Sequence, residues 1–299
     1  MNDKLQECIL CPRECKVDRI YGEKGFCRAG KNVSLARAAL HYWEEPCISG
    51  EKGSGTVFFS SCTMKCVFCQ NYNISTAKVG KEISICRLAE IFIELQNKGA
   101  HNINLVTPTH YVPQIIEALK ISKNNGLKIP IVYNSSGYEK VETIKMLDGY
   151  IDIYLPDMKY FNDKYAKKYS SAPNYFDAAK KSVDEMFKQV GKYEFDECGI
   201  MKKGVIIRHL MLPGLLFDSK KILDYIYNKY KNDVYLSIMN QYTPLGNVKN
   251  YPELNKKLNP KHYDSLVDYA IGLGIEKAFI QDGETAEESF IPEFNYEGI

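Results

Sequence analysis

Three closely spaced cysteines are the residues of this chain whose types and spacing are best suited to chemistry. Cys62, Cys66 and Cys69 follow an apolar run at 56–59 and precede a polar turn at 70–73. Thiolates are soft ligands that select iron–sulfur clusters, zinc or Cu(I). A four-iron cubane held by three cysteines keeps one iron without a protein ligand, and an open coordination site is typical of reactive metal centres. The spacing therefore favours a reactive cluster over three buried thiols or a zinc site completed from elsewhere.

A second cysteine set lies within the first thirty residues, near the glycines Gly22, Gly25 and Gly30. Its members are Cys8, Cys11, Cys15 and Cys27. Four thiolates suit either a tetrahedral zinc site or a second iron–sulfur cluster, and the spacing does not choose between the two. The three remaining cysteines stand alone, and we expect each to be a small buried hydrophobic residue. They are Cys47, Cys86 and Cys198.

The composition is that of a globular protein of 299 residues, with 45% hydrophobic residues. No apolar run approaches the ~18 residues of a membrane span, and the polar first residues lack a leader core. We therefore expect a cytoplasmic protein without a membrane partner, where ten cysteines indicate metal ligation and not disulfides. A net charge of +2 gives no clear nucleic-acid signal.

Short β-rich runs alternate with amphipathic helices from about residue 56 onward. Strands are expected at 56–60, 103–107, 130–134, 151–155, 204–212 and 234–239. Helices are expected at 88–98, 111–124, 139–147, 176–189, 219–231 and 260–273. Six strand–helix pairs predict a parallel sheet with right-handed crossovers, that is, an α/β partial (β/α)6 barrel. We assign this barrel to residues 53–299 and a small cysteine-rich, metal-binding extension to residues 1–52.

Polar side chains follow nearly every expected strand, at the edge where parallel α/β folds place their chemistry. Asp157 and Lys159 are two residues apart on an extended segment, so they face the same side and can hold a cofactor, a cation or a substrate. Arg208 carries a planar fork that can chelate a carboxylate. His110 is either a structural hydrogen-bonding residue or a ligand contact. The other candidates are Thr109, Asn134, Ser136 and Asn240.

The Cys-x3-Cys-x2-Cys spacing, with Phe68 directly before its last cysteine, resembles the signature of the radical S-adenosylmethionine (SAM) superfamily. Further stretches are similar to the pyruvate formate-lyase activating enzyme-related branch that carries an N-terminal cysteine knuckle. These stretches are 53–59, 107–110 and 288–294, together with the knuckle at 8–15. The chain departs from the usual pattern where Thr107-Pro108-Thr109-His110 replaces a Gly-Gly-Glu motif.

The resemblance implies a [4Fe–4S] cluster held by Cys62, Cys66 and Cys69, whose open iron binds the amino and carboxylate groups of SAM. It implies reductive cleavage of SAM to a 5′-deoxyadenosyl radical that abstracts hydrogen from a substrate. Lys159 is a candidate substrate contact. Together, the resemblance and the positions at strand ends predict these residues around SAM: Phe68, Thr109, His110, Asn134, Ser136, Asp157, Arg208 and Asn240.

Three functions remain open from the sequence. The first is activation of a glycyl-radical enzyme, in which a glycine of a partner protein loses hydrogen. The second is radical modification of a small molecule, a peptide or another macromolecule. The third is a non-catalytic iron–sulfur or zinc module for electron transfer. Both radical functions imply an electron donor such as ferredoxin or flavodoxin.

Overall fold

The computed structural model describes residues 2–281 and 292–299, and residues 288–291 of the C-terminal resemblance lie outside this part. Its centre is an open sheet in the order β10-β9-β8-β6-β5-β4-β2-β1-β3. Seven of these strands are parallel: β2 Ser54–Phe59, β4 Ile103–Val106, β5 Ile131–Ser135, β6 Ile153–Pro156, β8 Met201–Leu210, β9 Tyr235–Met239 and β10 Ala278–Ile280. The antiparallel strands are β1 Val33–His41, β3 Lys81–Ile83 and β7 Glu194–Phe195. The prediction of a partial barrel is confirmed.

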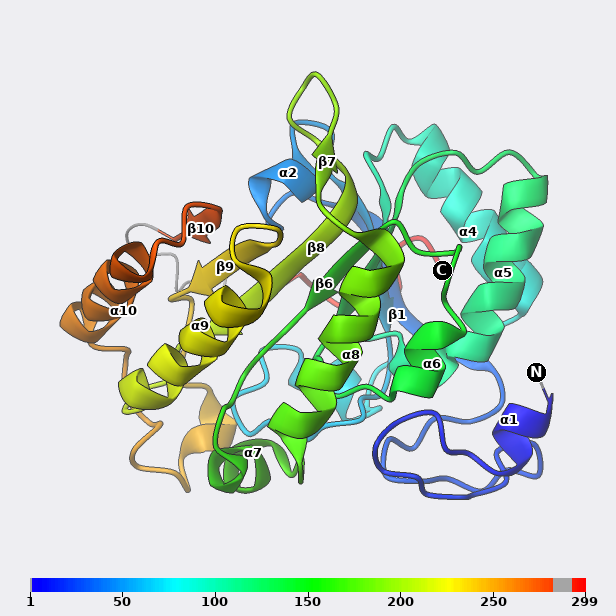
Figure 1. Cartoon of the computed structure of the whole chain (residues 1–299). Helices are drawn as coiled ribbons and strands as arrows, with labels where there is room; N and C mark the ends of the chain where they lie inside the picture. The colour runs from blue at the N-terminus through cyan, green and yellow to red at the C-terminus, as the bar shows by residue number, and fades with distance from the viewer. Residues whose placement is uncertain (1, 282–291) are drawn as a thin grey trace.

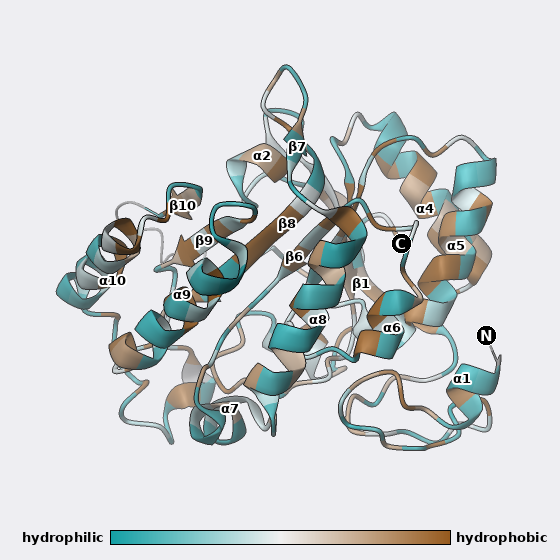
Figure 2. Cartoon of the chain, viewed as in Figure 1, coloured by the Kyte–Doolittle hydropathy of each residue, from teal (hydrophilic) through white to brown (hydrophobic). Residues whose placement is uncertain are grey.

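Helices connect successive parallel strands and cover the outer side of the sheet, so that α10, α9, α8, α6 and α5 follow one another across Figure 1. The long helices are α4 Ile85–Asn97, α5 Val112–Asn124, α8 Tyr175–Val190, α9 Leu216–Tyr230 and α10 Pro260–Leu273. The short ones are α1 Asn2–Gln6, α2 Pro46–Ser49, α3 Tyr72–Ser75, α6 Val141–Lys145, α7 Asp163–Ser170, η1 Thr109–Tyr111 and η2 Gly246–Val248. Their exposed faces are mainly hydrophilic in Figure 2. None of the helices in the described ranges is long and apolar enough to cross a membrane.

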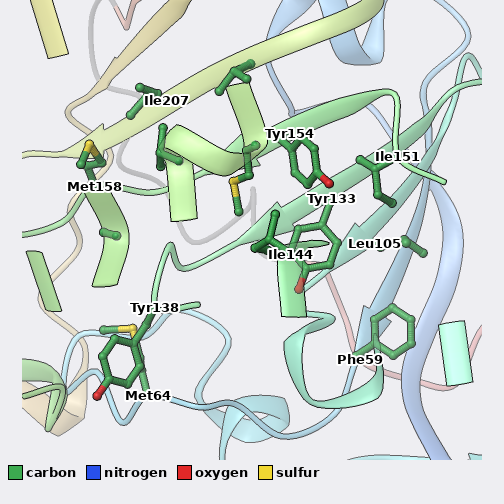
Figure 3. Packing of buried hydrophobic residues seen from close by; sticks show 14 of the residues in the cluster. Phe59, Met64, Leu105, Tyr133, Tyr138, Ile144, Ile151, Tyr154, Met158 and Ile207 are labelled. Atoms are coloured by element: carbon green, nitrogen blue, oxygen red, sulfur yellow. The ribbon is translucent and has the colours of Figure 1, made fainter. Parts of the chain in front are cut away.

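Both faces of the parallel sheet are buried, as expected for crossover topology. Tyr133 and Tyr154 point to the helix layer, where their ring centroids lie 5.9 Å apart (Figure 3). The residues that precede them, Val132 and Ile153, belong to a separate cluster that also contains Ile48 of α2. Because side chains alternate along a strand, this second cluster occupies the inner face of the sheet, and α2 covers it.

The structure contains all six predicted strands and all six predicted helices. It also contains elements that the sequence did not predict. The seventh parallel strand, β10, has three residues, too few for a recognisable period. β1 lies within the predicted extension 1–52, yet it pairs with β2 in the barrel sheet, and the division at residue 52 stays a prediction. Cys47 is buried as expected, whereas Cys86 and Cys198 are exposed, so the expectation of a buried thiol is wrong for these two.

The packing of the helices predicts how much each of two phenylalanines contributes to the free energy of unfolding. Phe92 of α4 is fully buried, whereas Phe217 of α9 is 79% exposed. Phe92→Ala should lower the free energy of unfolding by about 3–5 kcal/mol, because it leaves a cavity in the core. Phe217→Ala should change it by less than about 0.5 kcal/mol. Chemical denaturation followed by circular dichroism measures both, and equal effects would contradict this description of the core.

Candidate functional site

The carboxyl ends of the parallel strands surround a cavity of about 250 Å³. Cys62, Cys66 and Cys69 border it from the loop that follows β2. Six further predicted site residues also border it: Phe68, Asn134, Ser136, Asp157, Lys159 and Arg208. Side chains far apart in the sequence therefore meet in one place, because parallel strands deliver their following loops to the same edge of the sheet.

The cysteine loop is held by α7, a helix that the sequence analysis did not predict. The amide of Lys65 donates to the carbonyl of Ser170 at 3.0 Å, and the hydroxyl of Ser170 donates to Cys66 Sγ at 3.0 Å. Within the loop, the amide of Met64 donates to Cys62 Sγ at 3.4 Å. Donors aimed at sulfur stabilise thiolates, and hydrogen bonds to cluster sulfurs tune their potential.

Buried cysteine thiols lose their protons when they bind a metal. Burial raises the pKa of all three, that of Cys66 to about 11 although the Lys159 ammonium lowers it. Nowhere in residues 2–281 and 292–299 do three His, Cys, Asp or Glu side chains already form a site for a single ion. In a cubane each cysteine binds a different iron, so its ligands spread around the cluster. Three thiols around one cavity with amide and hydroxyl donors therefore fit a cluster.

Behind the thiols, a buried ionic network centres on Arg208. Its guanidinium donates to Asp157 Oδ1 at 3.1 Å, to Glu44 Oε2 at 3.2 Å and to Asn134 Oδ1 at 2.5 Å. Lys159 Nζ donates to the other oxygen of Asp157 at 2.5 Å. Burial raises the pKa of Asp157, but the Lys159 and Arg208 cations outweigh it and hold this pKa below its ordinary value. Arg208 thus reaches the cavity already paired with carboxylates.

Glu44 is a site residue that sequence reasoning missed. It lies between β1 and α2, and burial raises its pKa although Arg208 opposes this shift. Its side chain also accepts a hydrogen bond from Asn104 at 3.1 Å. The only signal in the sequence was the pair Glu44-Glu45 before Pro46, and no motif marks such a pair as part of a site.

Three predicted SAM contacts lie away from this cavity. Thr109 is buried, and its hydroxyl donates to Glu139 Oε1 at 2.6 Å. His110 is buried behind the cysteine loop, with Nε2 2.8 Å from the carbonyl oxygen of Ser60. Asn240 Nδ2 donates to the carbonyl of Gln281 at 3.1 Å, while Gln241 borders the cavity in its place. Position at a strand end did not determine where these side chains point.

The N-terminal cysteines surround a second and much smaller cavity, of about 10 Å³, which Arg19 and His110 also border. Its thiols are those of Cys8, Cys11, Cys15 and Cys27. The amide of Phe26 donates to Cys15 Sγ at 3.4 Å. A Cβ at Gly25 would lie 2.8 Å from that sulfur, so only glycine fits there. Burial raises the pKa of Cys11 to about 12, although the Arg13 amide lowers it.

Two arginines attach this cysteine loop to the barrel. Arg19 is 1% exposed and donates through Nη1 to the carbonyl of His110 at 2.7 Å. Arg13 donates through Nε to the carbonyl of Thr63 at 3.0 Å, which lies inside the loop of Cys62, and it stacks on Phe26. In Figure 1 the blue N-terminal loop lies below α6, at the end of the molecule opposite α2 and β7. The two cysteine sets are therefore structurally connected.

Comparison with known proteins agrees with this geometry. Residues 56–226 match the family model of the radical SAM superfamily, and the chain belongs to this superfamily. The uncharacterized protein MJ0674 of Methanocaldococcus jannaschii is 33% identical over 276 residues, which are 89% of this chain and 75% of that protein. The radical SAM fold implies a [4Fe–4S] cluster and SAM.

Two solved structures are similar to this chain at low sequence identity. SuiB of Streptococcus suis, bound to S-adenosylmethionine, has a TM-score of 0.50 and 14% identity over 75% of this chain. This chain spans about half of SuiB, 48% of its length. A domain of pyruvate-formate lyase-activating enzyme from Bacteroides vulgatus has a TM-score of 0.42 and 12% identity, over 57% of this chain and 92% of that one.

The ionic network makes a prediction about stability. Arg208→Gln leaves the buried Glu44 and Asp157 without their shared cation, so the free energy of unfolding should fall by about 3–5 kcal/mol. The matched control is Arg37→Gln, because Arg37 pairs with the half-exposed Glu297 and should lose no more than about 1 kcal/mol. Urea denaturation compares the two variants, and an Arg208→Gln protein as stable as the control would contradict the network.

Proposed function

We propose that this chain is a radical SAM enzyme whose [4Fe–4S] cluster is held by Cys62, Cys66 and Cys69. The observation that carries the proposal is the single cavity that these thiols share with polar side chains at the ends of five other parallel strands. A module for electron transfer alone needs cluster ligands, but it has no use for Asn134, Asp157 and other polar groups beside them. When bound, the cluster and SAM supply reductive cleavage to a hydrogen-abstracting 5′-deoxyadenosyl radical.

In this proposal, different residues around the cavity contact different parts of SAM. Phe68 lies beside Tyr242, with ring centroids 6.2 Å apart, and it offers an apolar surface to the adenine or shields the cluster. Asn134 and Ser136 supply polar groups for the ribose or methionine part. Arg208 keeps further N–H groups that can reach the SAM carboxylate, while Asp157 keeps its guanidinium oriented.

We place Lys159 toward the substrate and the cluster. Its ammonium is fixed by Asp157 and lies close enough to Cys66 to lower the pKa of that thiol, opposing burial. A fixed cation near the thiolates favours the reduced, more negative state of a cluster. The one-electron donor that this reduction needs is, in our proposal, a ferredoxin or flavodoxin. Thiol ligands persist in a reducing compartment, and we propose the cytoplasm.

The substrate that we propose is a glycine in a partner protein, as in glycyl-radical activation. Trp43 borders the cavity and is 63% exposed, and its neighbour Tyr42 is 51% exposed. Large exposed aromatic side chains are typical anchors of protein interfaces, which favours a macromolecular substrate over a small molecule.

We further propose that residues 1–52 form an extension whose cysteines hold a metal centre, either zinc or a second iron–sulfur cluster. Four thiols border one cavity, and the amide of Phe26 donates to the sulfur of Cys15. Such donors compensate the charge of thiolates that a metal would hold.

The radical reaction is tested through one cluster ligand. Cys66→Ala should abolish formation of 5′-deoxyadenosine by the reconstituted, reduced protein while its circular dichroism stays unchanged. Cys86→Ala is the matched control, because Cys86 is exposed on α4 and borders neither cysteine cavity. Anaerobic incubation with SAM and dithionite, followed by chromatography, measures the product. Full cleavage by Cys66→Ala would refute the assignment of the ligands.

The protein substrate is tested by electron paramagnetic resonance. A glycyl-radical enzyme of the same organism, incubated with the reduced protein and SAM, should acquire a glycine-centred radical. Trp43→Ala should weaken this transfer at least about tenfold, since interface tryptophans contribute about 2 kcal/mol or more. Tyr21→Ala, 84% exposed and remote from the cavity, serves as the control. Cleavage of SAM that depends on a small molecule, without a protein radical, would favour the alternative substrate class.

A further inference from the structure

The side chain of His110 carries a buried nitrogen whose partner is missing from the described part of the chain. His110 is 2% exposed, and its Nε2 lies 2.8 Å from the carbonyl oxygen of Ser60. A carbonyl oxygen only accepts hydrogen bonds, so Nε2 must carry the proton. In the neutral ring Nδ1 then presents a bare lone pair, and Nδ1 is buried without a hydrogen-bond partner in residues 2–281 and 292–299. Buried polar atoms of this kind call for an explanation.

The surroundings of the His110 ring explain the unpartnered Nδ1. His110 borders the same small cavity as the four N-terminal thiols, although it lies some eighty residues later in the chain. Its own carbonyl accepts from Arg19 Nη1 at 2.7 Å, and the same nitrogen of Arg19 lies 3.8 Å from Cys8 Sγ. The histidine is thus held against the cysteine loop on one side and against the end of β2 on the other.

We propose that Nδ1 of His110 is a ligand of the metal centre held by the N-terminal cysteines. The inference rests on the metal centre proposed above and names a further member of its ligand set. A metal-binding histidine characteristically donates its other ring N–H to a carbonyl or carboxylate, which fixes the ring and frees the second nitrogen. The contact with Ser60 has this arrangement. An imidazole with three thiolates is a common set for structural zinc, so His110 would take the place of one of the four thiols in a tetrahedral site.

The size of the cavity favours one ion over a cubane. Its volume of about 10 Å³ is comparable to that of a single water-sized sphere. The thiols border this space without converging on one point, so binding requires rotation of their side chains around it.

His209 offers a matched control, because it repeats the pattern away from the thiols. It is 1% exposed, its Nδ1 lies 2.7 Å from the carbonyl oxygen of Met158, and its Nε2 is buried without a partner among the described residues. His209 does not border the N-terminal cavity. An orphaned ring nitrogen alone therefore does not indicate a ligand, and proximity to the four thiols distinguishes His110.

The test uses the full chain with Cys62, Cys66 and Cys69 replaced by alanine, so that only the N-terminal centre can bind metal. Titration with Co²⁺ should give one tetrahedral, thiolate-bound ion per chain in the absorption spectrum. His110→Gln keeps an N–H that can reach the Ser60 carbonyl but has no atom equivalent to Nδ1. It should bind Co²⁺ at least about tenfold more weakly and with altered d–d bands, a loss of the order found for ligand-supporting residues.

The control His209→Asn, which can still donate to Met158, should leave the affinity and the spectrum unchanged. An unaltered affinity and spectrum in His110→Gln would overturn the ligand role and limit His110 to positioning Ser60. X-ray absorption at the zinc edge of the zinc-loaded parent chain needs no His110 variant: three sulfurs and one nitrogen support the proposal, and four sulfurs overturn it.

Different results would show that the N-terminal cysteines do not bind a single metal ion at all. A parent chain that binds neither Co²⁺ nor Zn²⁺ would refute the single-ion site, and an iron–sulfur spectrum insensitive to His110→Gln would refute it as well. Both results leave the radical reaction untouched, because formation of 5′-deoxyadenosine is measured on the chain with Cys62, Cys66 and Cys69 intact.

Discussion

The buried guanidinium of Arg208 is the interaction on which the candidate site depends. It joins three segments besides its own strand, through Asp157 after β6, Asn134 of β5 and Glu44 between β1 and α2. Parallel strands bring these segments to one edge but do not fix their separation, and a cation shared by two carboxylates does. Because the partners are buried, loss of the cation leaves Glu44 without a cationic partner and Asp157 with Lys159 alone, which is far more costly than loss of a surface pair. The network therefore holds these segments together and also lines the cavity.

The same network shows that the first 52 residues make direct contacts with the rest of the barrel. Glu44 lies within the first 52 residues, yet it pairs with a side chain of β8. Arg13 hydrogen-bonds the loop of Cys62 through Thr63, and Leu10 accepts a hydrogen bond from Thr143 of α6 at 2.7 Å. The N-terminal cysteine loop and the loop of Cys62 are consequently joined by direct contacts.

The sequence predicted the regular part of the fold because its signals are local. The face of α4 that carries Leu88, Phe92 and Leu95 is buried as its spacing indicates. The rule that chemistry gathers at strand ends correctly brought Asn134 and Asp157 to one cavity, although it says nothing about which way a side chain turns once the strand has ended. His110 sits on η1 and faces the N-terminal cysteines instead. Glu44 was missed because its partner is 164 residues away, a separation to which no local pattern refers.

The two cysteine sets border cavities of different size and enclosure, which indicates different functions. The thiols of Cys62, Cys66 and Cys69 open onto a cavity about twenty-five times larger than the one at the N-terminus, with room for a ligand beside a metal group. The N-terminal thiols are closed in by Arg19 and His110, and closed coordination is typical of structural metals. His110 contacts the carbonyl of Ser60, which lies only two residues before Cys62. The cavity of the N-terminal thiols and the loop of Cys62, Cys66 and Cys69 are thus joined through the segment that follows β2.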